Sequence, residues 1–206
     1  MSADIIYYKA LPVSPSVARV LHRLGYKKAS GPPPETVIRD IDRFISLLRV
    51  HGAFLRVPVA RVQAPDIFLG DGTVISSSGL SKLLKNSVEI AFLAAGAPDA
   101  PALIAERFST NAADKAVILD AVAAQCADAG LDSIQNIQGA LLRRQNLGFT
   151  ERRFSPGYGD VALSFQKNIY DRLMLGNLEM RIDENSYMLS PEKSVLAVAG
   201  VQSIAK

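Results

Sequence analysis

A nearly continuous apolar run, SVEIAFLAAG from Ser87 to Gly96, constrains the fold more than any other stretch of this chain. Strands that are buried in a protein interior carry such runs, whereas half-exposed strands alternate apolar and polar residues. We therefore expect a buried strand here. The run is much shorter than the roughly 20 apolar residues that a bilayer-spanning helix needs. No membrane span and no membrane partner are therefore expected.

The composition is that of a globular protein. The 206 residues are 49% hydrophobic and 21% charged, which allows a sizeable core. The formal charge is +3, but the basic residues are scattered rather than clustered, so a nucleic-acid partner is not expected. The N-terminal stretch MSADIIYYKALP lacks the regions of a secretory signal, and the single Cys126 cannot form an internal disulfide. These features favour a cytoplasmic location.

Helical and strand patterns occur in mixed order along the chain. Apolar residues three and four apart predict a helix from Pro34, and a helical block follows Ala100, with Asn111 as an N-cap and an interruption at Gly130. Strands are expected at both ends and in the middle of the chain, at residues 4–8, 53–63, 87–96, 178–189 and 194–202. The pattern predicts an α+β fold with a twisted, mainly antiparallel sheet covered by helices, in one domain spanning residues 1–206.

Most common active-site patterns are absent from the sequence. His22 and His51 have no partners at metal-ligand spacing, so no metal site is expected. The glycine motifs of dinucleotide and phosphate sites are missing, and so is the G-x-S-x-G nucleophile turn. Cys126 lies in an alanine-rich helical segment, which is typical of a small core residue. We expect no catalytic side chain.

The loop RRFSPGYGD, Arg152–Asp160, has an unusual composition for a turn. We expect it to join the helical block to the next helix, with Gly159 or Asp160 as the N-cap. Its glycines would let the backbone approach a flat ligand, Arg153 offers a planar fork that matches a carboxylate, and Tyr158 can stack. The residues alone leave two interpretations open, an ordinary Pro-Gly turn beside a surface arginine or a small-molecule site.

Two acidic residues of the helical block also allow two interpretations. Asp120 and Asp128 are eight positions apart, which places them on roughly the same helix face. They form either a solvated acidic stripe or a contact for a cationic ligand group.

The motif RFSPGY resembles the R-x-x-P-G-Y loop of the activation domain of cobalamin-dependent methionine synthase. RIDENSYMLSPEKSV is similar to a later stretch of that family, with Ser186, Pro191, Ser194 and Val195 at matching positions. AVILDAVAAQCAD resembles a family helix and places Asp128 where the family has a glutamate. VLHRLGY and EIAFLAAG also occur in the family order, so the resemblance covers nearly the whole chain. The chain departs from the family at Leu147, where the family has an acid, and it ends soon after Gly200 without the family's aromatic C-terminal extension.

The resemblance implies a binding site for S-adenosylmethionine. Arg153 would pair with the methionyl carboxylate, and Asp128 would face the ammonium group or the ribose. The backbone of the loop would contact the adenine, with Tyr158 beside it. The loop residues are Ser155, Pro156, Gly157, Tyr158 and Gly159.

The family function implied is the reductive reactivation of methionine synthase. The activation domain presents S-adenosylmethionine to oxidised cobalamin while an electron donor protein supplies an electron, and the methyl group goes to cobalt. This chain has no D-x-H-x-x-G cobalamin motif, so the cobalamin would belong to a partner, methionine synthase or another corrinoid protein. A freestanding reactivation subunit is the first expectation. The alternatives are a corrinoid-protein partner that has lost the ligand, and an S-adenosylmethionine-binding regulator of another methyl-transfer system.

Overall fold

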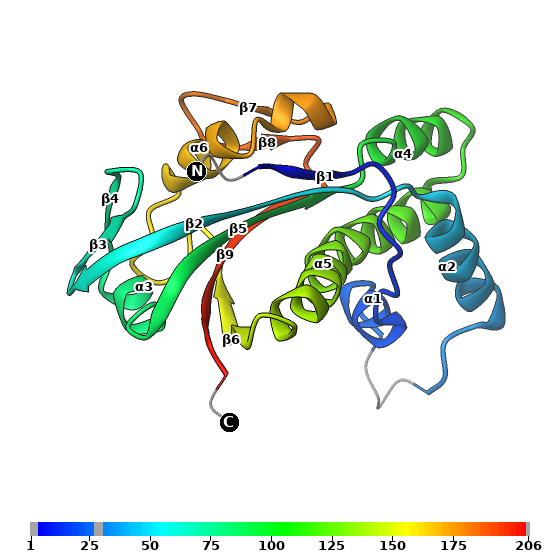
Figure 1. The fold of residues 1–206 in the computed structure, drawn as a ribbon. Helices are drawn as coiled ribbons and strands as arrows, with labels where there is room; N and C mark the ends of the chain where they lie inside the picture. Colours follow the sequence, from blue (N-terminus) through cyan, green and yellow to red (C-terminus); the bar gives the residue numbers. More distant parts are fainter. Residues whose placement is uncertain (1–3, 27–30, 205–206) are drawn as a thin grey trace.

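The computed structural model describes residues 4–26 and 31–204, and its centre is an antiparallel sheet. The strand order is β4-β3-β2-β5-β9-β6, and β1 pairs with β2. The three longest strands lie side by side in Figure 1. They are β2 (His51–Gln63), β5 (Ser87–Gly96) and β9 (Ser194–Ser203). The shorter ones are β1 (Ile6–Tyr8), β3 (Asp66–Leu69), β4 (Val74–Ser76) and β6 (Leu147–Phe154), and β7 (Arg181–Ile182) pairs separately with β8 (Leu189–Ser190).

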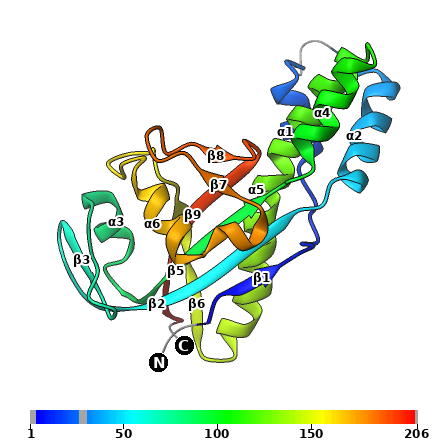
Figure 2. The ribbon, with the colours of Figure 1, turned by 90° about the horizontal axis from the view of Figure 1, so that it is seen from above.

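Helices cover this sheet, which confirms the predicted α+β class. The longest helix crosses one face, and three others gather around its N-terminal end (Figures 1 and 2). The bounds are α1 (Val17–Arg23), α2 (Glu35–Leu47), α3 (Ser78–Leu83), α4 (Ala100–Ser109), α5 (Ala113–Arg143) and α6 (Phe165–Arg172), with a short 3₁₀ helix η2 (Leu175–Leu178). In the part of the chain that the structure describes, no helix has the length and apolarity needed to cross a membrane.

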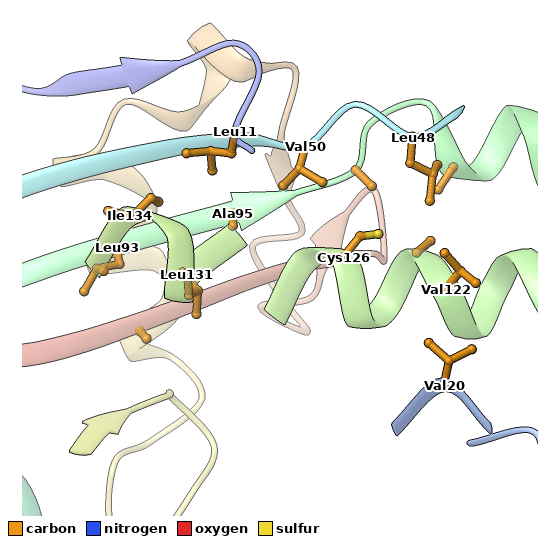
Figure 3. Close-up of a cluster of buried hydrophobic side chains, with 14 of the residues drawn as sticks. Leu11, Val20, Leu48, Val50, Leu93, Ala95, Val122, Cys126, Leu131 and Ile134 are labelled. Atoms are coloured by element: carbon orange, nitrogen blue, oxygen red, sulfur yellow. The ribbon is translucent and has the colours of Figure 1, made fainter. Parts of the chain in front are cut away.

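A hydrophobic core lies on each face of the sheet. Leu93 and Ala95 of β5 face Leu131 and Ile134 of α5, as Figure 3 shows. Residues at the alternate positions of β5, Ile90, Phe92 and Ala94, lie in the second core beneath α3 and α6. Because both faces are buried, strand β5 carries apolar residues at nearly every position, and the prediction of a buried strand is confirmed.

The expected interruption at Gly130 is wrong, because α5 is one continuous helix of 31 residues. A Cβ atom at Gly130 would lie 2.7 Å from Ala95 Cβ and 2.8 Å from Val50 Cγ1. The glycine therefore permits a close approach of helix to sheet rather than breaking the helix. Cys126, on the same helix, is fully buried as predicted, and burial raises the pKa of its thiol to about 11.

Two other helix boundaries differ from the prediction. Asn111 is not an N-cap; it has a φ of 55°, its N–H donates to the Phe108 carbonyl, and it lies in the turn between Thr110, the C-cap of α4, and Ala112, the N-cap of α5. The helix expected from Asp160 begins only at Phe165.

A strand was missed altogether. Residues Leu147–Phe154 form β6, although the sequence predicted helix followed by loop. The segment GFTERRF has too few apolar residues to show a strand pattern. β6 is an outer strand of the sheet and pairs with β9 alone.

The packing at Gly130 generates a stability prediction with a matched control on the same helix. Gly130→Ala forces Ala95 or Val50 to move, so it should lower the free energy of unfolding by about 1–3 kcal/mol. A Cβ atom at Gly139 meets its nearest neighbour at 3.7 Å, an ordinary contact. Gly139→Ala should therefore stabilise by about 0.5–1 kcal/mol through helix propensity. Urea unfolding measures both, and equal effects of the two substitutions would contradict the close approach.

Candidate functional site

A bulge in β6 sets the position of Arg153. Phe149 pairs with Val201 and Arg153 with Ala199, so three residues of β6 lie opposite Gly200 alone. The hydroxyl of Thr150 fills the gap in the ladder, because it accepts from the Gly200 N–H at 3.0 Å and donates to the Arg152 carbonyl at 2.8 Å. The bulge keeps Phe149 and Arg153 on the same side of the sheet, toward α5.

The loop after β6 folds into a tight pair of turns. The N–H of Gly157 donates to the Val161 carbonyl at 2.8 Å, and the N–H of Tyr158 donates to the Ser155 carbonyl at 3.3 Å. Gly157 has a φ of 86°, a left-handed conformation that favours glycine. Pro156 is buried, whereas Tyr158 is 72% exposed. The loop therefore has a fixed backbone and presents an aromatic side chain to solvent.

Asp160 anchors the loop to a neighbouring helix instead of capping its own. Its carboxylate accepts from the Gly79 N–H at 3.1 Å and from the Ser77 hydroxyl at 2.9 Å, at the start of α3. The expected N-cap of the following helix is thus wrong. The bond from Gly79, and then that from Ser77, hold the pKa of Asp160 below its ordinary value.

Helix α5 presents a row of polar side chains to this region. Asp128, Asp132 and Gln135 follow one another at helical spacing, so they share a face. The Nη1 of Arg153 donates to Asp132 Oδ1 at 2.5 Å and to Gln135 Oε1 at 2.7 Å. Asp128 makes a long contact with Gln125, at 3.4 Å, and no ion pair among the described residues involves it.

The second acidic residue of the predicted pair has a partner within the chain. Asp120 lies 2.8 Å from the Lys193 ammonium group. Asp120 is therefore paired with a lysine of the same protein, whereas no such ion pair involves Asp128 among the described residues.

A cleft of about 380 Å³ lies where these segments meet. β6 pairs with β9 only from Val198 to Ser203, so the first residues of β9 extend past the end of β6. The cleft occupies this edge, between β9, α5 and the loop. Its lining consists of Asp128, Leu131, Arg153, Ser155, Pro156, Tyr158, Gln166, Leu189, Ser194, Val195 and Leu196.

The structure brings together most of the predicted site residues. Asp128, Arg153, Ser155, Pro156 and Tyr158 all line the cleft, whereas Gly157 shapes the loop without lining it. Ser194 and Val195, matched in the family resemblance, lie there too. Sequence reasoning missed Gln166, which stands on α6 without any recognisable motif, and it missed both partners of Arg153 on α5.

Neither histidine contributes to the cleft. His22 is exposed on α1, and His51 lies at the start of β2 with its Nδ1 buried and unpartnered. Across residues 4–26 and 31–204, no group of three His, Cys, Asp or Glu side chains is placed to hold a metal ion.

A solved structure shares this arrangement of sheet, crossing helix and loop. A crystal structure of the MetH reactivation domain bound to AdoHcy superposes on this chain with a TM-score of 0.71. The match covers 100% of this chain and 80% of that chain, at 14% sequence identity. No protein-family model matches the sequence, and no curated protein matches it significantly. The fold is thus that of the methionine synthase activation domain, as the sequence resemblance implied.

The anchor at Asp160 generates a pH prediction. A carboxylate with a lowered folded-state pKa stabilises the protein above its ordinary pKa of 3.8, and this contribution is lost as the pH falls through the lowered value. Asp160→Asn should therefore destabilise the protein at pH 6, and the difference from wild type should shrink below pH 3.8. Unfolding curves across this range measure the difference. Glu151→Gln, at an exposed carboxylate on β6, is the control, and an Asp160→Asn difference independent of pH would contradict the anchor.

Proposed function

We propose that this chain is a freestanding S-adenosylmethionine-binding subunit that supports the reductive reactivation, or remethylation, of cobalamin-dependent methionine synthase. One observation carries the proposal. Residues from two stretches that resemble the family, Asp128 on α5 and the RFSPGY residues at the end of β6 and in the following loop, line one cleft. The similar fold of the MetH reactivation domain, which binds AdoHcy, supports the same ligand class. We also propose that residues 1–206 act as one activation-domain-like unit.

The residues of the cleft fit S-adenosylmethionine in size and in chemistry. A volume of about 380 Å³ falls within the range of small-molecule sites, about 300–1,000 Å³. Arg153 matches the carboxylate of the methionyl end, and Asp128 matches its ammonium group. The fixed backbone from Ser155 to Gly159 contacts the adenine, and Tyr158 stacks beside it. Leu131, Leu189 and Leu196 supply apolar walls.

The protein's own residues bind and orient the ligand and do no acid–base work. Bound S-adenosylmethionine would supply a methyl cation to the corrinoid of the partner protein and leave as S-adenosylhomocysteine, and an electron donor protein would supply the one electron that the oxidised corrinoid needs. Proximity and orientation are then the contribution of this chain. The exposure of Tyr158 leaves one side of the cleft accessible to such a partner.

A second candidate function rests on one observation. Arg153 already has two acceptors within the chain, Asp132 and Gln135, which is also the arrangement of a structural arginine. The protein would then be a corrinoid-protein partner that keeps the fold and binds no S-adenosylmethionine. Ligand titration separates the two functions.

Arg153→Ala should weaken the binding of S-adenosylmethionine and S-adenosylhomocysteine. A charge-assisted contact contributes about 1.5–3 kcal/mol, which corresponds to roughly 10- to 150-fold in affinity. Calorimetric titration measures the effect. Arg152→Ala is the matched control, because Arg152 is exposed on the same strand and should change the affinity little. Equal affinities of wild type and Arg153→Ala would place the ligand elsewhere, and a wild type that binds neither ligand would favour the second candidate.

The assignment of the cobalamin to a partner gives a further prediction. Because the sequence has no cobalamin motif, the purified protein should show no corrinoid absorption. Stoichiometric cobalamin in its visible spectrum would contradict the proposed division between this chain and its partner.

A further inference from the structure

The guanidinium group of Arg153 uses only one of its nitrogens within the described part of the chain. Nη1 donates both bonds to α5, one to Asp132 and one to Gln135, whereas Nε and Nη2 donate to no described residue. The arginine side chain is 26% exposed and lines the cleft. One edge of the guanidinium is therefore fixed to a helix, and the opposite edge, Nε with Nη2, has no partner among these residues.

We propose that Asp132 and Gln135 are positioning residues, which hold Arg153 so that its Nε–Nη2 edge receives the carboxylate of the ligand's amino-acid end. This inference rests on the proposed function. A guanidinium fork binds a carboxylate through two parallel N–H bonds only when its plane is correctly oriented. Both acceptors belong to the 31-residue helix α5, which is packed against the sheet. The long arginine side chain is thus ordered before the ligand binds, which lowers the entropy lost on binding.

The two acceptors differ in charge, so their removal distinguishes a positioning effect on Arg153 from an electrostatic effect on the ligand. Asp132 is 57% exposed, so solvent screens its repulsion of a ligand carboxylate. Gln135 is neutral and half-buried. If holding the guanidinium in place is the shared role, removal of either acceptor weakens ligand binding in the same direction.

Selective loss of the amino-acid contact is the signature of this role. S-adenosylhomocysteine carries the carboxylate, whereas 5′-methylthioadenosine has the same adenosine and sulfur without the amino-acid end. Gln135→Ala and Asp132→Ala should each weaken S-adenosylhomocysteine roughly 3- to 10-fold, as expected for one hydrogen bond. The affinity for 5′-methylthioadenosine should stay unchanged. Calorimetric titration of the full chain measures both ligands.

Two controls test whether the effect passes through Arg153. Asn136→Ala changes an exposed neighbour of Gln135 that makes no hydrogen bond to Arg153, and it should leave both affinities unchanged. In the Arg153→Ala background, Gln135→Ala should have no further effect, because the two residues then act as one unit.

Several outcomes would overturn the inference. If the wild type binds S-adenosylhomocysteine and the Gln135→Ala variant binds it equally well, Gln135 does not position Arg153, and the proposed function stands. Tighter binding by Asp132→Ala would make Asp132 a competitor of the ligand instead of an anchor. Equal weakening of both ligands would indicate general damage to the cleft. A wild type that binds neither ligand would overturn the proposed function and this inference with it.

Discussion

The contact between helix α5 and strand β5 at Gly130 sets the geometry on which the candidate site depends. With no Cβ on Gly130, the helix approaches Ala95 and Val50 closely enough to place the next turn, with Leu131 and Asp132, beside the end of β6. A longer helix-to-sheet distance would move Asp132 and Gln135 away from Arg153. The same helix turns carry the core residues Leu131 and Ile134, so stability and site geometry share one interface.

The pairing of β9 with β5 and β6 determines the side of the candidate site that lies opposite α5. β9 pairs with β5 from Ser194 to Gln202, but it pairs with β6 only from Val198 to Ser203. The first residues of β9, which do not pair with β6, and the turn after β6 form one side of the cleft. Helix α5 forms the other side. The Asp160 anchor ties this turn to α3, so the loop backbone is held from both ends. A ligand at this edge would meet a preformed surface, which favours binding without large rearrangement.

How much of the fold the sequence predicts depends on how many faces of each element are buried. β5 was predicted because both of its faces are covered, and α2 because Ile41 and Phe44 form one apolar stripe. β6 was missed because it is an outer strand with exposed charged residues, Glu151 and Arg152, and a three-residue bulge that removes any alternation. Gly130 was misjudged because a glycine that permits close packing and a glycine that ends a helix look identical in sequence.

Some residues of the candidate site could be predicted from the sequence, and others could not. Arg153 and the loop up to Tyr158 were predicted from a local motif, and Asp128 from its place in a resembled helix. Asp132 and Gln135 were not, because they are polar residues on a helix face, and only the fold brings them to a strand that begins twelve or more residues later. Contacts between distant segments of this kind leave no periodic signal in a single sequence.

A crystal structure of the protein grown with S-adenosylhomocysteine shows whether the cleft is the ligand site. We expect one ligand in the cleft between α5 and the loop, with its carboxylate at hydrogen-bonding distance from Nε and Nη2 of Arg153, and its adenine against the backbone of residues 155–159. Nη1 should keep its bonds to Asp132 and Gln135. A ligand bound elsewhere, a carboxylate turned away from Arg153, or an empty cleft at saturating ligand concentration would contradict this expectation.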